Sequence, residues 1–547
     1  MSRLAILLLA LAVPARAQDA YDLVVYGATA GGVTTAISGA RHGLKTVLIE
    51  PGRHVGGMST GGLSRTDVGK REVIGGMALE FYQLVGDRYE MRRYNQPVAW
   101  FYEPKVGELV MRQWLKDSGV TVLFGHRLEE KDGVVKDGAR VVEIVTENGA
   151  RFRGSVFADC SYEGDLMAQA KVSYTWGREA VSEYGESLAG VRDRTPLHQF
   201  MVDIPAHDKS GAVLPEVSPG PPGEPGSADH RVQAYNFRVI ATDDPANRMP
   251  WPKPDGYTSV RYALLGRLLE ATTAQKGRAP IFNEVALIAR LPGRKADINN
   301  NGAFSTDYIG KNYEYPEGSY RRRAGIWKEH VDYVQGFFYF LANEEAVPAS
   351  LQAEVRQWGP PRDEFEDTGH WPHQLYVREA RRLVGEYVMT QKDLQTDRVK
   401  PDVIGMGSYN SDSHNVQRFV NAKGFAENEG DMQVPVQPYQ IPYRMLLPKA
   451  AEASNLLVPV AFSASHVAYS SLRMEPQYMI NGHAAGVAAW LALRDLRPVQ
   501  AIDVAELQGI LKKEAAVFDY VPHPQQEALR ILRNKYAPRP PAPFNWE

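Results

Sequence analysis

The chain has 547 residues, of which 44% are hydrophobic and 23% charged, with 48 glycines and 36 prolines. At roughly 100–200 residues per domain, this length predicts two or three domains, and the composition excludes a collagen, a coiled coil and a wholly disordered chain. Lys and Arg number 62 against 65 Asp and Glu, so the net charge of -3 lacks the basic excess typical of nucleic-acid binders.

The beginning of the chain has the pattern of an export signal. Arg3 precedes an apolar run from Leu4 to Val13, and Ala15-Arg16-Ala17 is a cleavage site of the A-x-A type. An apolar run of about ten residues is too short for a bilayer core, which needs about 20. We expect residues 1–17 to be removed and the mature protein to be periplasmic or secreted. No later stretch reaches membrane-spanning length, and the single cysteine, Cys160, permits no intrachain disulfide.

A dinucleotide-binding unit follows at once. Residues 22–26 predict a buried parallel strand, residues 27–32 (Gly-Ala-Thr-Ala-Gly-Gly) a tight turn, and residues 33–40 a helix. A second strand, residues 46–50, ends in the acid Glu50. This is the strand–turn–helix–strand context that the G-x-G-x-x-G fingerprint requires.

Each fingerprint position has a physical purpose. Gly27 permits the tight turn, Gly32 lets the helix pack closely on the strand, and the helix N-terminus attracts a pyrophosphate. Glu50 is placed to accept hydrogen bonds from a ribose diol. Thr29 departs from the pattern, because it stands where the second glycine normally approaches the pyrophosphate.

A glycine-rich loop comes directly after the second strand. Residues 56–62 contain four glycines in seven positions, which excludes the interior of a helix or a strand. Such a loop allows the backbone to lie against a flat ligand.

Two later segments extend this unit. Residues 134–153 alternate and turn like a small antiparallel meander that leads into a strand ending at Asp159 and then into Gly164 and Asp165. Far downstream, residues 455–460 predict a buried strand, which His466 and Arg473-Met474-Glu475 follow. The next helix, through residues 484–489, is rich in small residues that allow close packing.

Together these segments resemble the bacterial FAD-dependent oxidoreductases of the broad FAD-oxidored family, some of which are labelled xanthan lyase-like. Residues 292–300, 407–415 and 442–449 carry the resemblance further, so it covers nearly the whole mature chain. It implies FAD as the cofactor. The predicted cofactor-binding residues are Gly27, Thr29, Gly31, Gly32, Glu50, Gly56, Gly57, Met58, Asp159, Gly164, Asp165, Arg473, Glu475, Gly482 and Gly486.

The resemblance also implies an α/β fold. It predicts a Rossmann-like FAD-binding domain of the glutathione-reductase type, split into residues 21–178 and 404–493, with an α+β substrate or cap region between them at residues 179–403. Residues 494–547 are expected to form a helical tail with a proline-rich end at Pro538 to Pro543. Pro215 to Pro225 should be an exposed excursion.

Polar groups in the middle of the chain leave alternatives open. Residues 299–302 (Asn-Asn-Asn-Gly) predict either a plain turn or a substrate loop. Arg378 and Arg382 recur at helical spacing, which indicates a solvated or salt-bridged helix face, although Arg378 is also a catalytic candidate. Residues 321–323 are a short basic run of surface type. His370 and His373 lack sequence partners for a metal site, so no metal is predicted.

The best candidate for proton transfer is His414. It lies on a segment dense in hydrogen-bonding groups, with Asp412 and Asn415 beside it to fix or polarise a substrate. A histidine next to a flavin is suited to take a hydroxyl proton while a hydride leaves. His466 is the rival, and a structural role for His414 is the alternative.

Three functions are consistent with the sequence. The first is an exported FAD-dependent dehydrogenase or oxidase that acts on a sugar, polyol or hydroxy acid and passes electrons to oxygen, a quinone or a redox protein. The second is a reductase of activated double bonds with Arg294, Arg378 or Arg444 as proton donor. The third is a glycan-active lyase or binding protein with a structural flavin. No second dinucleotide fingerprint is convincing, since Gly405-Met406-Gly407 lacks the third glycine.

Overall fold

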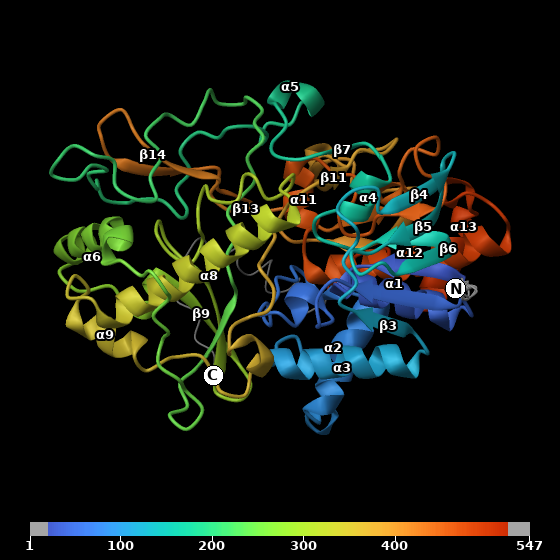
Figure 1. Ribbon diagram of the computed structural model, residues 1–547, viewed down its shortest axis with the longest axis horizontal. Helices are drawn as coiled ribbons and strands as arrows, with labels where there is room; N and C mark the ends of the chain where they lie inside the picture. Colours follow the sequence, from blue (N-terminus) through green and yellow to red (C-terminus); the bar gives the residue numbers. More distant parts are fainter. Residues whose placement is uncertain (1–19, 523–547) are drawn as a thin grey trace, which may run out of the picture.

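The structure, a computed structural model, describes residues 20–522, and the expected signal segment and proline-rich end lie outside them. Figure 1 shows two parts side by side, one built on a large sheet and the other crossed by the long helix α8 (Tyr320–Asn343). Within the described residues, no helix has the length and apolar character of a membrane span.

The large sheet has seven strands in the described part of the chain. Its order is β3 (Thr121–Phe124), β2 (Thr46–Glu50), β1 (Tyr21–Tyr26), β6 (Arg151–Asp159), β5 (Arg140–Val145) and β4 (Val134–Asp137), with β18 (Leu456–Leu457) also on β6. The strands β3, β2, β1, β6 and β18 are parallel, whereas β4, β5 and the start of β6 form the expected antiparallel meander. The Rossmann-like α/β prediction is confirmed.

Strand β1 shows why the sheet is buried on both faces. Leu23 and Val25 pack in the large core that also contains α1 (Ala30–Arg41). Val24 and Tyr26 point to the opposite face and join the meander in a second core. Because successive side chains of a strand alternate between faces, an uninterrupted apolar strand satisfies both cores.

Helices cover one face of this sheet. They are α1, α2 (Gly76–Arg88), α3 (Pro104–Asp117), α12 (Glu475–Arg494) and α13 (Val504–Lys513). Gly482 and Gly486 of α12 lie against α1, where a Cβ on Gly482 would come within 2.2 Å of the Gly31 carbonyl oxygen. A Cβ on Gly31 would in turn lie 3.0 Å from the Tyr478 carbonyl oxygen. These glycines therefore permit the close approach of the two helices.

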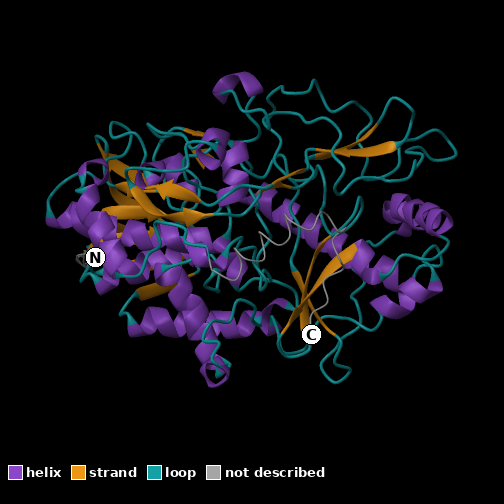
Figure 2. Ribbon diagram, turned by 180° about the vertical axis from the view of Figure 1, so that it is seen from behind, coloured by secondary structure: helices purple, strands orange, loops and turns teal. Residues whose placement is uncertain are grey.

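The middle of the chain forms the second part, which we call the cap region (Figure 2). It contains an antiparallel sheet of β8 (Val239–Thr242), β10 (Lys295–Asn300) and β9 (Ala286–Leu291). Its helices are α5 (Val181–Tyr184), α6 (Ala263–Lys276), α7 (Phe282–Val285), α8 and α9 (Ala349–Val355). This α+β composition agrees with the expected cap, and residues 215–225 are mostly exposed as expected.

Short strand pairs and helices connect the two parts. The pairs are β7 (Tyr174–Thr175) with β11 (Arg382–Leu383), β12 (Val403–Gly407) with β17 (Tyr439–Pro442), β13 (Ser411–Ser413) with β16 (Met432–Val434), and β14 (Gln417–Val420) with β15 (Ala426–Glu429). The short helices are α4 (Asp165–Gln169), α10 (Gln391–Gln395) and α11 (His466–Leu472). Isolated bridges join Pro205 to Phe425 and Ser218 to Phe419, so β14 and β15 contact the cap region.

Two expectations about local structure need correction. The strand expected over residues 455–460 is only Leu456–Leu457, because the next amide, of Val458, bonds to the Leu446 carbonyl instead of a neighbouring strand. The helix expected around Arg378 and Arg382 is absent, since that segment is extended and enters β11. Both arginines are almost fully buried and not solvated.

Candidate active site

The fingerprint loop has the geometry that a bound pyrophosphate requires. Gly27 has φ +92°, and a Cβ there would lie 2.8 Å from the Ser161 amide nitrogen, so only glycine fits. Thr29 caps α1: its hydroxyl oxygen accepts the Gly32 N–H at 3.2 Å and donates to the Cys160 carbonyl at 2.7 Å. The side chain at the position of the missing glycine thus turns toward β6, and the first N–H groups of α1 remain available to an anion.

Glu50 ends β2 beside this loop. Its carboxylate accepts the Ala28 N–H at 2.8 Å and the Gly52 N–H at 2.6 Å. Burial raises the pKa of Glu50 to about 7 against the effect of these hydrogen bonds. The side chain is therefore fixed at the place where the fingerprint puts a ribose acceptor.

The glycine-rich loop is fastened to the start of α12. The Met58 N–H donates to the Tyr162 hydroxyl at 2.9 Å, and that hydroxyl donates to Glu475 at 2.8 Å. The Ser59 hydroxyl donates to the other oxygen of Glu475 at 3.1 Å. Gly56 and Gly57 both adopt positive φ. Glu475, predicted to bind the cofactor, thus holds the loop through two protein hydroxyls.

The residues after β6 stabilise the turn that approaches the fingerprint. Asp159 accepts hydrogen bonds from the Ser161 N–H at 3.1 Å and the Met167 N–H at 2.8 Å. Gly164 has φ +67°, and Asp165 begins α4. Asp165 also pairs with Arg323 of α8, so residues 321–323 are not merely a surface run.

Several buried hydrogen-bond donors in the described residues lack a protein partner. The site fits a flavin if a bound flavin supplies acceptors for these donors. They include the Nε of Arg473, the Nδ2 of Asn415 and the hydroxyl of Ser64. Buried polar atoms in folded proteins nearly always have partners. Arg473 and Asn415 are in the segments predicted to approach the flavin, and a flavin ring edge or a substrate oxygen supplies the acceptors that they need. The residues present therefore fit FAD.

His414 belongs to a buried ionic triad. Its Nδ1 lies 2.5 Å from Oδ2 of Asp307, and Arg378 donates to Oδ1 of the same carboxylate at 3.1 Å. Burial lowers the pKa of His414, and the Arg378 charge adds to this effect. For Asp307, burial raises the pKa, but the His414 and Arg378 interactions outweigh it and keep the pKa below its usual range. The ionised Asp307 therefore accepts the Nδ1–H, and Nε2 is left with its lone pair free.

A second group of residues lies beside this triad. The Tyr376 ring contacts the Arg378 guanidinium, whose carbon is 4.2 Å from the ring centroid, and the Tyr376 hydroxyl accepts from Arg473 at 3.0 Å. Arg473 also donates to the Asp412 carbonyl at 2.7 Å, while the Asp412 carboxylate is 3.7 Å away. The structure thus brings Arg378, Asp412, His414 and Arg473 together.

His466 lies in a separate ionic network. Its Nδ1 is 2.8 Å from Glu379, which also pairs with Arg382, and its backbone N–H donates to Glu179 at 2.9 Å. Burial raises the pKa of Glu379, but the charges of His466 and Arg382 reverse this effect and leave the pKa at about 2. His466 is thus buried, and its backbone N–H and its ring Nδ1 both have carboxylate partners. For His414, by contrast, no hydrogen bond to Nε2 is found among the described residues.

The other predicted polar residues lie elsewhere. The Arg294 side chain is 61% exposed and that of Arg444 is 40% exposed, and they pair with Asp243 and Asp402. Asn299 and Asn300 end β10, and Asn301-Gly302 turns the chain back. Asn300 accepts the Asp307 N–H at 3.4 Å, so the turn supports the triad.

Asp307 was missed by the sequence analysis. It is 107 positions away from His414 and lies in a loop after β10, with no motif around it. The one signal in the sequence was its position, because Asp307 comes shortly after the asparagine turn at residues 299–302 that we considered as a substrate loop.

Comparison with known proteins gives a family. A family model described as FAD dependent oxidoreductase matches residues 22–511. Vinyl phenol reductase of Lactiplantibacillus plantarum is 37% identical over 119 residues, which cover 19% of this chain and 21% of that protein, so the match spans about a fifth of the relative. Among solved structures, L-amino acid deaminase from Proteus vulgaris is 15% identical at a TM-score of 0.22, with 29% of this chain and 52% of that chain covered. L-proline dehydrogenase from P. horikoshii is 14% identical at a TM-score of 0.23, with 30% and 59% covered.

Proposed function

Because the chain belongs to the FAD-dependent oxidoreductase family, we propose that it is a dehydrogenase or oxidase of a polar alcohol: a sugar, a polyol or a hydroxy acid. The observation that carries this proposal is the His414–Asp307 pair, in which a buried imidazole is oriented by a carboxylate. An alcohol carbon becomes a good hydride donor as its hydroxyl proton is removed, and this pair is suited to remove it.

His414 is the general base of this proposal. Asp307 accepts the Nδ1–H and thereby fixes the tautomer that presents an unprotonated Nε2. The substrate hydroxyl gives its proton to Nε2 as the carbon–hydrogen bond breaks, and the alcohol becomes a carbonyl. FAD, when bound, supplies the ring that accepts the hydride. The Arg378 charge favours ionised Asp307 and neutral His414, so Nε2 is unprotonated before the proton transfer.

Arg473 and Asn415 are the substrate-orienting groups. Each has a buried nitrogen without a partner in the described residues, and each is next to the triad in space or in sequence. Such donors favour a substrate oxygen that carries partial or full negative charge. Among the three substrate classes, they favour a hydroxy acid.

The reduced flavin of this proposal passes its electrons to an acceptor other than a nicotinamide. Gly405 and Gly407, which lack the third glycine of a second fingerprint, lie inside β12 and not at a strand–helix turn. We propose oxygen, a quinone or a redox protein as the acceptor. We also propose that the protein is exported after cleavage at Ala17; mass spectrometry of the mature N-terminus would test this, and an intact Met1 in the exported fraction would contradict it.

A reductase of activated double bonds is the second candidate. The similarity to a vinyl phenol reductase favours it, although that similarity covers 19% of this chain. Of the three arginines considered as proton donors, only Arg378 is buried at the site, and burial lowers its pKa. A lyase with a structural flavin is not proposed, since the family description is that of an oxidoreductase.

Anaerobic flavin bleaching separates these candidates. Purified protein is mixed without oxygen with sugars, polyols and hydroxy acids in turn, and the loss of the yellow flavin absorbance is followed. The proposal expects bleaching by a member of one of these classes. If none bleaches the flavin while a reduced dye drives reduction of an enoate, the second candidate replaces the first.

A further inference from the structure

Two histidines from different parts of the molecule stack on one another. His54 lies in the loop between β2 and the glycine-rich loop, and His373 lies in the cap region. Their rings are nearly parallel, with 3.9 Å between the centroids and an interplanar angle of 9°. The carboxylate of Glu108, on α3, is 3.1 Å from Nδ1 of His54. One ligand atom of each of these three residues lies within 4.8 Å of those of the other two.

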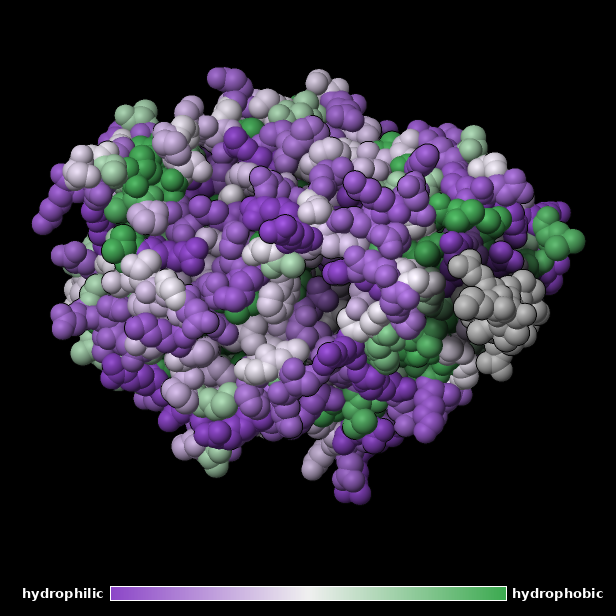
Figure 3. All heavy atoms as spheres, in the orientation of Figure 1, coloured by the Kyte–Doolittle hydropathy of each residue, from purple (hydrophilic) through white to green (hydrophobic). Residues whose placement is uncertain are grey.

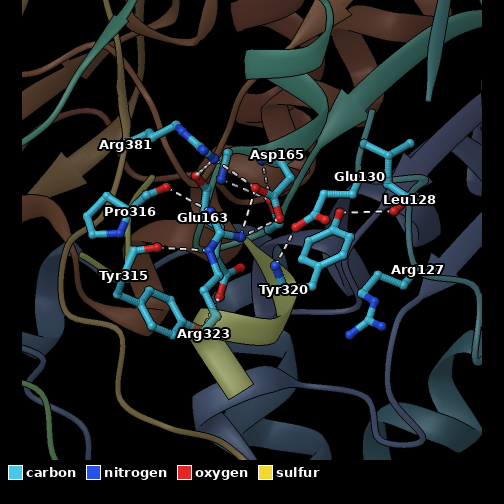
Figure 4. A network of polar contacts seen from close by, with 12 residues as sticks. Arg127, Leu128, Glu130, Glu163, Asp165, Tyr315, Pro316, Tyr320, Arg323 and Arg381 are labelled. Atoms are coloured by element: carbon cyan, nitrogen blue, oxygen red, sulfur yellow. Dashed lines mark hydrogen bonds and ion pairs between the residues drawn. The ribbon is translucent and has the colours of Figure 1, made fainter. Parts of the chain in front are cut away.

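Another junction of the two parts is complete without a ligand. Figure 4 shows Asp165, at the start of α4, between Arg323 and Arg381 of the cap region. These arginines donate to the carboxylate at 2.8 and 2.7 Å. The acid and both bases are therefore matched there. The cluster at His54 differs, because one of its imidazoles has no such partner.

That imidazole is the ring of His373. Both of its nitrogens are buried, and neither has a hydrogen-bond partner in the part of the chain that the structure describes. Buried polar atoms in folded proteins nearly always have a partner. His54, by contrast, has Glu108 at Nδ1, and its Nε2 is 3.2 Å from Asp367. Stacking therefore accounts for the position of the His373 ring but not for its nitrogens.

A metal ion bound by two imidazoles and one carboxylate supplies the missing partner. Histidine nitrogens and carboxylate oxygens are ligands of Zn²⁺, which holds four ligands in a tetrahedron at about 2.0–2.2 Å. Two ligand atoms of such a tetrahedron are about 3.3 Å apart, which is close to the 3.1 Å between Nδ1 of His54 and Oε2 of Glu108. Arg112 donates to Oε1 of Glu108 at 2.8 Å, so Oε2 is the oxygen left for an ion.

The outer contact of His54 also has the arrangement of a zinc ligand. A histidine that binds a metal through one nitrogen usually donates the N–H of the other to a carboxylate or a carbonyl, which fixes its tautomer. With Nδ1 of His54 toward the ion, Nε2 carries the hydrogen and faces Asp367. His373 has to tilt out of the parallel stack to reach the same ion, so zinc binding and ring stacking exclude one another.

We propose that His54, Glu108 and His373 form a zinc site, with Asp367 as the outer partner of His54. All three ligands are half-buried, so water reaches the fourth position of the tetrahedron. Zn²⁺ has no redox chemistry, and the role of this ion is to tie the cap region to the loop that leads into the glycine-rich segment. That segment begins at Gly56, two residues after His54.

Zinc affinity of the full-length, FAD-bound protein tests this proposal. The protein is first stripped with a chelator, and Zn²⁺ is then titrated in competition with a chromophoric chelator. The wild type should bind one zinc ion per chain. His373→Phe keeps a flat ring against His54 but has no ligand atom, and Glu108→Gln removes the carboxylate. Each should weaken zinc binding by more than the about 10–100-fold that is typical of losing an outer partner. Zinc in excess should raise the unfolding temperature of the wild type and not that of His373→Phe.

His370→Asn and Glu514→Gln are the matched controls. His370 is three residues from His373, but its Nδ1 is 3.2 Å from the Glu364 carbonyl oxygen. Glu514 also lies between two histidines, His42 and His483, and each of its oxygens already has one of them as a partner. Both controls should bind zinc like the wild type, and thermal unfolding of the zinc-free variants shows that they are folded. A wild type that binds no zinc, wild-type affinity in His373→Phe or Glu108→Gln, or an equal loss in either control would overturn the proposal.

Discussion

Nδ1 of His414 donates a hydrogen bond to the carboxylate of Asp307 across 2.5 Å, although 107 positions separate the two residues in the chain. Asp307 is fixed in turn by Arg378 and by the asparagine turn after β10. The pair lies beside Arg473, which belongs to the segment before α12, and thus where the cap region meets the FAD-binding part. Its geometry leaves one imidazole nitrogen free to act on a ligand.

Changing Asp307→Asn should slow anaerobic flavin reduction by about 10²–10⁴-fold, because the amide no longer enforces the tautomer with a free Nε2. The FAD content should stay unchanged, since Asp307 bonds to His414, Arg378 and Asn300 and not to the fingerprint loop. Stopped-flow absorbance measures the rate, and Asp255→Asn, an exposed residue, is the control. Equal rates in Asp307→Asn and the wild type would show that the pair has only a structural role.

Changing Glu50→Gln should weaken FAD binding by about 1–3 kcal/mol, the scale of a lost hydrogen bond to a charged group. Glu50 accepts two backbone N–H groups next to the fingerprint loop, and an amide oxygen replaces only one of these acceptors. Fluorescence titration with FAD measures the loss. The exposed substitution Glu270→Gln should leave the affinity unchanged; unchanged affinity in Glu50→Gln as well would exclude Glu50 as the ribose acceptor.

Changing Gly482→Ala should destabilise the protein by about 1–3 kcal/mol through overpacking. The new Cβ would lie 2.2 Å from the Gly31 carbonyl oxygen and 2.3 Å from the Thr34 hydroxyl. FAD affinity should fall too, because α1 presents its N-terminus to the pyrophosphate. Gly509→Ala on α13 is the control, since nothing lies within 4 Å of its added Cβ. Urea unfolding compares the two, and equal stability would contradict the close packing of α1 and α12.

His330 should make stability depend on pH. Burial lowers its pKa from 6.5 to about 4, so between these values the unfolded chain binds a proton that the folded chain does not. Stability is therefore fully present above pH 6.5 and is lost as the pH falls toward 4. Between pH 7 and pH 5, wild-type protein should lose about 2 kcal/mol more unfolding free energy than His330→Phe. Parallel losses in the two proteins would show that His330 is not the group responsible.

Local patterns predicted the FAD-binding part well. The fingerprint, the acid at the end of β2 and the small residues of α12 each reflect contacts within a strand, a turn or one helix pair. Thr29 could not be placed in advance, because its inward orientation depends on the carbonyl of Cys160 at the end of a distant strand. Residues 404–493 were assigned to one domain, yet β14 and β15 within them reach the cap region. That boundary stays a prediction.

The candidate catalytic group was predicted only in part. His414 stood out because polar residues surround it in sequence, but Asp307 has only the nearby asparagine turn as a local signal and meets His414 only after β10 and β13 are placed in space. The helix predicted from the spacing of Arg378 and Arg382 was wrong. Both arginines are buried in an extended segment, where Arg378 pairs with Asp307 and Arg382 pairs with Glu179 and Glu379. Long-range charge pairing overrides a local periodicity in such places.

The surface of the molecule is polar over most of the face that Figure 3 shows, with apolar side chains in small separate groups. The role of the buried triad in proton transfer most needs a direct test.

That test is the rate of anaerobic flavin reduction in His414→Ala, measured by stopped-flow with a substrate that bleaches the wild-type flavin. Loss of a general base typically costs about 10²–10⁴-fold in rate, and this loss is expected with the FAD content intact. His230→Ala, a partly exposed histidine stacked on Trp176, should reduce at the wild-type rate. A wild-type rate in His414→Ala would contradict the account, and His466→Ala would then be measured before the double-bond reductase with Arg378 as donor is adopted.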